Sequence, residues 1–309
     1  MHCICMALRV ILCEELVHSG MLGLAVDVMV QCEFALGVIN AVGTDAQKDR
    51  FLRPAIAGEK LIALGISEPG AGSDVSAVQT SAQRDGDDYV INGAKTFISS
   101  AGRADFVTLA VRTGAAGHGG MSLIVVPCDT PGFSRTRMKK VGVHTSLTCE
   151  LSLQDVRVPA ANLLGRENEG FKLIMQHFQG ERLVLACFAN EMMQSALDLA
   201  LDYGRERKVF GQTLTSYQIW KHRLADVMTT LAASRALTYQ ACDRLVRKDN
   251  PETAVSMAKL FATEAVKPMI NECFQVFGGY AYMDEAGVDV SILSSFEYDG
   301  VEVVSNAQV

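Results

Sequence analysis

Residues 67–74 read Ser67-Glu68-Pro69-Gly70-Ala71-Gly72-Ser73-Asp74, a glycine-rich stretch in a region of short β-type runs. The two glycines allow a tight turn that exposes backbone amides beside the hydroxyl groups of Ser67 and Ser73. Such a loop is suited to binding a ligand, although taken alone it is equally an ordinary glycine-rich turn. It matches neither the Walker A pattern nor the dinucleotide-binding fingerprint.

The loop lies in the second of three zones that differ in periodicity. Residues 1–60 follow a helical pattern, and Thr44 with Gln47 forms a capping-box signature. Residues 61–165 contain five short strand-like runs without helical patterns between them, which favours an antiparallel barrel or sandwich. These runs are 61–66, 89–92, 106–111, 122–126 and 149–153.

The helical period returns from residue 166 to residue 288 in three long segments, near 168–203, 216–248 and 252–277. The order of helices, strands and helices predicts an α+β fold with a β domain between two helical parts. Pro268 inside the third long segment is expected to kink or break that helix.

Composition narrows the class of protein. The 309 residues are 49% hydrophobic with a net charge of −7, so no broad basic surface is available for nucleic acid. The nine cysteines are scattered among apolar residues and indicate buried free thiols, and no cysteine or histidine spacing predicts a metal site. No signal peptide and no uncharged membrane-spanning stretch is recognised, which predicts a soluble intracellular protein.

Three further segments carry candidate ligand-binding residues. Residues 95–100, Lys-Thr-Phe-Ile-Ser-Ser, place an aromatic ring and hydroxyls at a strand end, where they can flank a planar ring or belong to an ordinary strand with Phe97 in the core. Residues 207–211, Arg-Lys-Val-Phe-Gly, end a long helical pattern, where the arginine suits a phosphate or simply the helix C-terminus. Residues 275–280, Gln-Val-Phe-Gly-Gly-Tyr, combine glycines for a helix cap or for close approach to a diphosphate.

The four segments, in this order and spacing, resemble the acyl-CoA dehydrogenase family. Glu68 to Asp74 matches the family's signature loop, and residues 155–159, 162–165 and 169–171 match its passage from the β domain to the helices. The resemblance extends from about Leu12 to Gly287. It implies the family's fold: residues 1–60 as a remnant of the N-terminal helical domain, 61–165 as the β domain, and 166–288 as the C-terminal helical bundle.

Glu181 is the candidate catalytic base. It interrupts an apolar stripe at helical spacing, formed by Ile174, Phe178, Leu185, Phe188 and Met192, and no cation lies one turn away. A carboxylate in an apolar site has a raised pKa, which suits a general base, although a partnered structural glutamate is an alternative. The segment Glu181-Arg182-Leu183 is similar to the motif of the isovaleryl-CoA and long-chain members, which place their base on this helix. The resemblance therefore implies Glu181 as the base and Arg182 as a positioning residue.

The reaction implied by the resemblance is α,β-dehydrogenation of an acyl-CoA thioester, in which Glu181 removes the α-proton and hydride passes to N5 of FAD. Ser73 and its loop are expected to face the CoA moiety. The residues expected to contact FAD are Ser67, Gly72, Ser73, Phe97, Ser99, Arg207, Phe210, Gln218, Gln275, Gly278 and Gly279. Those from Arg207 onward are expected to do so across a subunit boundary.

The partners implied by the resemblance are an electron-transferring flavoprotein and further copies of the chain, in a homodimer or homotetramer. The location implied is the bacterial cytoplasm or the mitochondrial matrix. Two other functions remain open: a catalytically impaired or non-catalytic protein with the same fold, and an acyl-CoA oxidase. Acyl chain length and branching stay undetermined.

The two ends differ from the family pattern. Residues 1–10 stand where the family has several more helices, and residues 289–309 form a tail without a recognised match. The expected arginine-rich helix and Gly-Thr-x-Glu segment of the family are not found. We therefore expect a truncated N-terminus, an altered C-terminus and weakened FAD binding.

Overall fold

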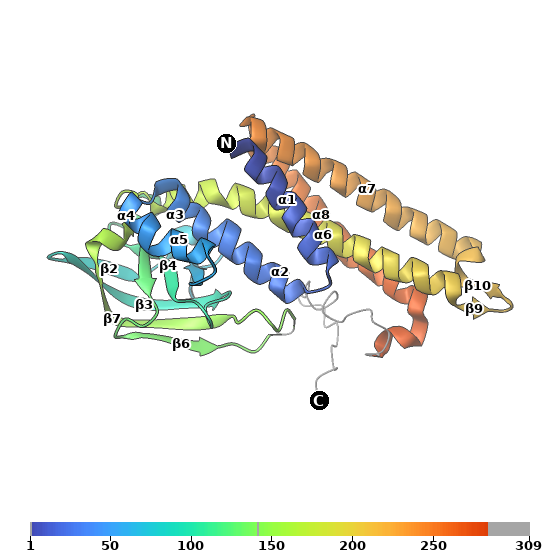
Figure 1. The fold of residues 1–309 in the computed structure, drawn as a ribbon, viewed down its shortest axis with the longest axis horizontal. Coiled ribbons are helices and arrows are strands. Elements are labelled where there is room, and N and C mark those ends of the chain that lie inside the picture. Colours follow the sequence, from blue (N-terminus) through green and yellow to red (C-terminus); the bar gives the residue numbers. More distant parts are fainter. Residues whose placement is uncertain (1, 141, 284–309) are drawn as a thin grey trace. The chain divides into compact units, whose positions relative to one another are not determined.

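Two compact units make up the fold. A computed structural model describes residues 2–140 and 142–283. The strand unit consists of residues 26–140 and 144–178, and the helical unit of residues 1–25, 141–143 and 179 onward. Figure 1 shows the strands within the first unit and the long helices within the second. The predicted α+β fold, with strands in the middle of the chain and helices after them, is confirmed.

The strand unit is built on one eight-stranded sheet with the order β6-β7-β3-β2-β4-β5-β8, and β1 pairs with β4 outside this path. The strands are β1 Ile62–Gly65, β2 Ser81–Asp85, β3 Asp88–Ile98, β4 Phe106–Arg112, β5 Met121–Pro127, β6 Phe133–Arg137, β7 Cys149–Pro159 and β8 Leu163–Leu164. Most neighbours are antiparallel, but β4 runs parallel to β1 along the length of β1 and to β2 at Ser81, the first residue of β2. The sheet is therefore mixed.

Both faces of the central strands are buried. Leu109 of β4 and Ile124 of β5 belong to one apolar cluster, whereas Ala110 and Leu123, their neighbours in the chain, belong to a second. Side chains alternate between the faces of a strand, so the nearly continuous apolar runs of β4 and β5 supply both clusters. The sequence runs are apolar throughout because neither face meets water.

Short helical segments cover the second cluster. They follow α2 Leu22–Met29 and consist of a π-helical turn Val30–Ala35, α3 Leu36–Val42, α4 Asp45–Gln47, a π-helical turn Lys48–Leu52 and α5 Arg53–Ile56. Phe51 packs edge-on against Phe106 of β4, with ring centroids 5.0 Å apart. The predicted capping box is confirmed, since the backbone amide of Gln47 donates to Thr44 Oγ1 and the amide of Thr44 donates to Gln47 Oε1.

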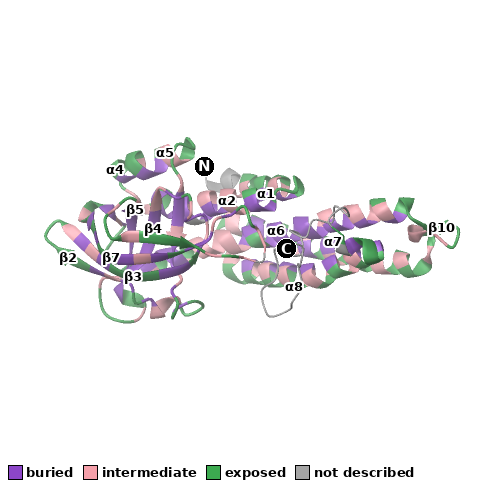
Figure 2. Ribbon diagram, turned by 90° about the horizontal axis from the view of Figure 1, so that it is seen from below, coloured by how far each residue is buried: buried purple, intermediate pink, exposed green. Residues whose placement is uncertain are grey.

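The helical unit contains α1 His2–His18, most of α6 Gly170–Glu206, α7 Gln218–Arg247 and α8 Pro251–Phe277. Buried residues recur along α7 and α8 every three or four positions, as a helix facing a core requires. Figure 2 shows these buried positions along the long helices. The expected break at Pro268 does not occur, because α8 continues through this exposed residue to Phe277.

Buried polar residues join α6 to α7. The side-chain amide of Asn190 donates to Thr238 Oγ1 at 2.9 Å, and the hydroxyl of Ser234 donates to Asn190 Oδ1. All three residues are fully buried. Since a buried polar atom without a partner is costly, this network fixes how the two helices align.

The thiols bear out part of the compositional analysis. Cys187, Cys242 and Cys273 are free and buried, as predicted. Within residues 2–140 and 142–283, no group of three or more His, Cys, Asp or Glu is placed to hold a metal ion.

One segment, Leu22–Val42, is long and apolar enough to cross a membrane by length and composition. It includes Asp27 and Glu33, and 53% of its apolar window is buried within the structure. Core helices of soluble proteins have the same properties, so this is weak evidence for a membrane span.

Replacing Asn190 with alanine is expected to lower the free energy of unfolding of the helical unit by about 1–3 kcal/mol, because the hydroxyls of Ser234 and Thr238 lose a buried partner. Urea unfolding followed by the fluorescence of Trp220, on α7 of the same unit, measures this change. Asn271→Ala, at an exposed position of α8, is the control and should leave the midpoint unchanged. Equal effects of the two substitutions would contradict the assignment.

Candidate functional site

The glycine-rich loop follows β1 and folds back on itself. The amide of Glu68 donates to the carbonyl of Ala71 at 2.8 Å, and the amide of Ala71 donates to the carbonyl of Glu68 at 3.1 Å. Gly72 and Ser73 are exposed at the tip, while Ser67 at the base is half-buried. A Cβ added at Gly70 or Gly72 would meet no atom within 4 Å, so this side of the loop is open to a ligand.

A buried ion pair holds the base of the loop. Lys95 Nζ on β3 lies 2.7 Å from Glu68 Oε1 and 3.1 Å from the carbonyl oxygen of Ile66, and both charged side chains are buried. The Glu68 carboxylate also accepts from the amides of Gln79 and Thr80. The acid thus ties the outgoing half of the loop to its returning half.

The environments of the two charges differ. Burial raises the pKa of Glu68, but the charge of Lys95 and the hydrogen bonds from Lys95, Thr80 and Gln79 outweigh it, so the pKa lies below its usual value. Burial lowers the pKa of Lys95 to about 8, against the opposing influence of Glu68. Both groups are therefore charged at neutral pH.

The second predicted segment lies directly beside the loop. The amide of Thr96 donates to the carbonyl of Ser67 at 2.9 Å. Phe97, the next residue, has φ 58° and is 62% exposed, so the alternative that it belongs to the core is wrong. A bulky residue with positive φ is uncommon and occurs often at functional sites. Ser99 is half-buried in the turn directly after the same strand.

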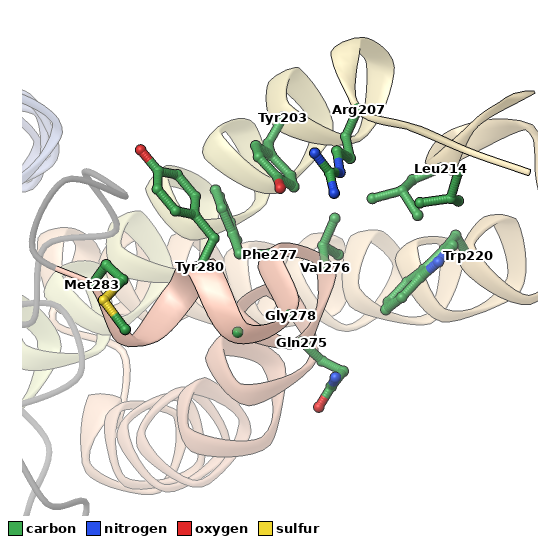
Figure 3. Close-up of a pocket in the computed structure, with 12 residues that line it drawn as sticks. Tyr203, Arg207, Leu214, Trp220, Gln275, Val276, Phe277, Gly278, Tyr280 and Met283 are labelled. Atoms are coloured by element: carbon green, nitrogen blue, oxygen red, sulfur yellow. The ribbon is translucent and has the colours of Figure 1, made fainter. Parts of the chain in front are cut away.

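The other two predicted segments meet in a cavity of about 820 Å³ in the helical unit. The cavity lies between the C-terminal end of α6, the start of α7 and the segment Gly278–Tyr282 after α8. Its lining consists of Tyr203, Arg207, Val209, Leu214, Trp220, Gln275, Val276, Phe277, Gly278, Gly279, Tyr280 and Met283. Figure 3 shows Arg207 between Tyr203 and Leu214, while the side chain of Gln275 points away from Arg207.

Four of the six residues predicted in this region line the cavity: Arg207, Gln275, Gly278 and Gly279. The other two do not. Phe210 occupies the tip of the hairpin formed by β9 Lys208–Val209 and β10 Gln212–Thr213, and it is 97% exposed. Gln218, the first residue of α7, is exposed.

Two aromatic residues of the cavity, Tyr203 and Trp220, were missed from the sequence. The rings of Tyr203 and Phe277 stack with centroids 4.6 Å apart, and the guanidinium carbon of Arg223 lies 5.1 Å from the ring centroid of Trp220. Tyr203 and Trp220 lie on helical stretches, where an aromatic residue normally indicates core. Only their position next to helix ends signals a ligand site.

Gly278 has a conformation that the cavity wall requires. Its φ of 60° and ψ of −139° are strained for any residue with a side chain. A Cβ at Gly278 or Gly279 would meet no atom within 4 Å, so the backbone here borders open space. Together with Arg207 and the aromatic rings, this wall fits a ligand that carries both a planar ring and a phosphate.

Glu181 lies on the long α6 helix, in the helical unit. The residue is half-buried, and its Oε1 atom is buried. Within the predicted stripe, Ile174, Phe188 and Met192 are buried, but Leu185 is 42% exposed. The stripe is therefore an incomplete apolar face near Glu181. Arg182 is half-buried beside it.

Comparison with known proteins identifies the class. A family model for the acyl-CoA dehydrogenase middle domain matches residues 63–156, and one for the C-terminal domain matches residues 168–293. The second match continues past Gly287 into the predicted tail. Residues from 284 onward, including that tail, lie outside the part of the chain that the structure describes.

Individual relatives agree with the family models. Cyclohexane-1-carbonyl-CoA dehydrogenase of Geobacter metallireducens is 40% identical over 242 residues, which are 78% of this chain and 64% of that protein. The structure of butyryl-CoA dehydrogenase from Megasphaera elsdenii is 35% identical, with a TM-score of 0.88, and the match covers 92% of this chain and 74% of that one. An FAD complex of PigA matches with a TM-score of 0.86 at 25% identity, over 89% of this chain and 73% of that one.

The chain belongs to the acyl-CoA dehydrogenase family. It spans just under two thirds, 64%, of the length of the Geobacter relative. FAD is the cofactor that the family and its solved complexes indicate. The open glycine wall, the arginine and the aromatic rings of the cavity fit such a dinucleotide.

Replacing Lys95 with methionine is expected to destabilise the strand unit by about 3–5 kcal/mol near neutral pH, because Glu68 keeps a buried charge without its partner. Hydrogen exchange of β3 amides measures this loss. Lys60→Met is the matched control, since Lys60 forms a comparable but exposed pair with Asp105 and its replacement should have little effect.

In the same variant, the contribution of Glu68 to the free energy of unfolding should depend on pH with the opposite sign. In the wild type the pKa of Glu68 is lowered, so its contribution is present above the unfolded value of 4.5 and is lost as pH falls through the folded pKa. Without Lys95, burial is opposed only by the hydrogen bonds from Thr80 and Gln79, so the pKa of Glu68 should rise and the variant should regain stability as the pH falls from about 7 to about 5. The rate of amide hydrogen exchange in β3, corrected for its intrinsic pH dependence, measures this change in stability. A variant that is equally unstable at pH 7 and at pH 5, about two units apart, would refute the role assigned to the ion pair of Glu68 and Lys95.

Proposed function

We propose that the chain catalyses α,β-dehydrogenation of an acyl-CoA thioester with Glu181 as the base. The observation that carries this proposal is a half-buried glutamate with a buried carboxylate oxygen, on a largely apolar helix, within the Glu-Arg-Leu motif. A carboxylate shielded from water on one side is a stronger base toward carbon than a solvated one. Arg182, the next residue, positions the substrate or the acid.

Removing a proton from the α-carbon of a thioester requires a base that is correctly placed before the reaction begins. Glu181 lies in the interior of a 37-residue helix, far from either helix end, so its backbone has little freedom. Buried neighbours Leu183 and Val184 fix the same turn. A base held in this way takes the α-proton without first being reoriented.

FAD supplies the redox chemistry when bound, by accepting the hydrogen and electron pair that leave the β-carbon. Ser67, Phe97 and Ser99 hold its ring system at the edge of the strand unit, where the exposed ring of Phe97 provides a flat surface. Gly72 and Ser73 lie at the loop tip, and Ser73 faces the CoA part of the substrate.

The cavity of the helical unit binds the phosphate-containing part of the cofactor, from a second copy of the chain. Arg207 pairs with the diphosphate, and Gln275, Gly278 and Gly279 supply polar and backbone contacts. Phe210 and Gln218 are exposed outside the cavity, which is compatible with contact to the cofactor of a partner subunit. This arrangement requires a homodimer or a homotetramer.

Electron-transferring flavoprotein is the proposed acceptor that reoxidises the flavin, since some relatives associate with such a protein. Relatives include bacterial and mitochondrial enzymes, so either the bacterial cytoplasm or the mitochondrial matrix is a compatible location.

Glu181→Gln should lower turnover of the FAD-loaded protein by at least about 10²-fold to 10⁴-fold, because the amide cannot accept the α-proton. A dye-reduction assay with short, branched and long acyl-CoAs measures turnover, and the flavin absorbance checks that FAD is retained. Glu206→Gln, an exposed position at the end of the same helix, is the control. Wild-type turnover in the Glu181 variant would show that another group is the base.

Arg207→Ala should weaken FAD binding about tenfold or more, because a charged hydrogen bond to phosphate contributes about 1.5–3 kcal/mol. Fluorescence titration of the cofactor-free protein with FAD measures the affinity. Arg205→Ala is the matched control, since Arg205 lies on the same helix end but pairs with Asp202 on the surface. If both variants bind FAD as the wild type does, Arg207 has no role in the cofactor site.

A further inference from the structure

Arg112 binds the backbone of two different loops at once. It is the last residue of β4 and is half-buried. Its Nη2 donates to the carbonyls of Ser76 at 2.7 Å and Val78 at 3.0 Å, and its Nε donates to Val78 at 3.2 Å. Its Nη1 donates to the carbonyls of Ala115 at 3.1 Å and Gly117 at 2.6 Å. All these acceptors are backbone oxygens, so the side chain fixes main-chain shape.

The first of these loops returns from the exposed Ser73 to β2. Its returning segment, residues 76–80, is held from both sides. Glu68 accepts the amides of Gln79 and Thr80, whereas Arg112 donates to the carbonyls of Ser76 and Val78. The backbone amide of Arg112 also donates to the carbonyl of Thr80 at 2.7 Å. Since this segment precedes the sheet, these charged side chains replace the strand partners that its backbone lacks.

The second loop connects β4 to β5 and consists of residues 113–120, Thr-Gly-Ala-Ala-Gly-His-Gly-Gly. It contains no large apolar side chain that can anchor it in a core. The amides of Thr113 and Gly114 donate to the carbonyl of Gly120, and Thr113 Oγ1 donates to Asn168 Oδ1 at the start of the loop. Arg112 holds the middle of the loop at Ala115 and Gly117. Four glycines give this backbone many alternative conformations, so the bonds from Arg112 restrict it strongly.

The tips of the two loops lie near each other. The imidazole of His118 stacks on Phe171 with centroids 4.1 Å apart and lies within electrostatic range of Asp74. Asp74 follows Ser73 directly in the first loop. The exposed side chains of Ser73, Asp74 and His118 therefore belong to one surface, with Arg112 beneath it.

We propose that Arg112 is a positioning residue that couples the loop carrying Ser73 to the loop carrying His118, and that it thereby sets the affinity for the CoA part of the substrate. The inference rests on the proposed function, which assigns Ser73 to CoA. A lysine cannot replace this side chain, because its single ammonium group cannot reach four carbonyls in a planar fork. Loss of the coupling acts on the two loops, and Glu181 lies ten residues further along α6 than Phe171, the residue that His118 contacts.

Arg112→Lys in the FAD-loaded full chain tests the proposal by hydrogen exchange, by titration with free coenzyme A and by steady-state kinetics. Exchange should accelerate about tenfold in residues 73–80 and in residues 113–120 together. The Kd for coenzyme A and the KM for acyl-CoA should rise about tenfold, while kcat changes by less than about twofold. Arg157→Lys is the control, because Arg157 lies on the same sheet but pairs with the surface acids Asp85 and Asp88.

Unchanged exchange in either loop, or unchanged affinity for coenzyme A, would overturn the proposal. A parallel loss of FAD and of kcat would also overturn it, because Arg112 would then support the whole strand unit rather than the two loops. Absence of turnover in the wild-type protein would count against the proposed function alone, since exchange and coenzyme A binding still decide the coupling.

Discussion

The ion pair between Glu68 and Lys95 is the interaction on which the strand unit's candidate site depends. Two buried charges are tolerated only when each satisfies the other and further hydrogen bonds complete their shells. Here the Lys95 ammonium group also donates to the carbonyl of Ile66, and the carboxylate accepts two backbone amides. The pair therefore sets the path of the chain before and after the loop. Removing either charge leaves the other buried, so the sequence must keep both.

The segments that flank the glycine-rich loop are held in place by hydrogen bonds to it. Thr96 follows Lys95 and bonds to Ser67, which places the unusual backbone of Phe97 beside the base of the loop. Arg112 holds the returning segment from the carbonyl side. The anionic Glu68 and the cationic Lys95 and Arg112 thus form a charged layer. It lies beneath the exposed loop tip of Gly72 and Ser73. Such a layer gives a polar, preorganised backbone, while Ile66, Ala71 and Val78 of the same segment belong to the second apolar cluster.

The α6 helix plays a comparable part in the helical unit. It carries Glu181, then Asn190 of the buried network with α7, and finally Tyr203 at the cavity. Side chains on one continuous helix keep a nearly fixed separation, because the rise per residue is constant. Packing that aligns α6 with α7 therefore also sets the position of the proposed base relative to the cavity wall.

Periodicity predicted the three long helices, because burial on one face of a helix imposes a repeat along the sequence. The five strand runs were recognised as short, mostly apolar stretches between turn residues. The parallel pairing of β1 with β4 was not predictable, since strand runs carry no information about their neighbours. Glycines and Arg207 marked the cavity, whereas Tyr203 and Trp220 resembled core residues. The burial of Lys95 and the carbonyl contacts of Arg112 depend on chain segments far apart in sequence. Single positions in a helical or strand pattern do not show such contacts.

The most direct test of the central claim is to add acyl-CoA anaerobically to the FAD-loaded protein and record the flavin absorbance. The account predicts loss of the oxidised flavin spectrum together with formation of the α,β-unsaturated thioester. Retention of the oxidised spectrum with short, branched and long acyl-CoAs, in a protein that holds FAD, would contradict it.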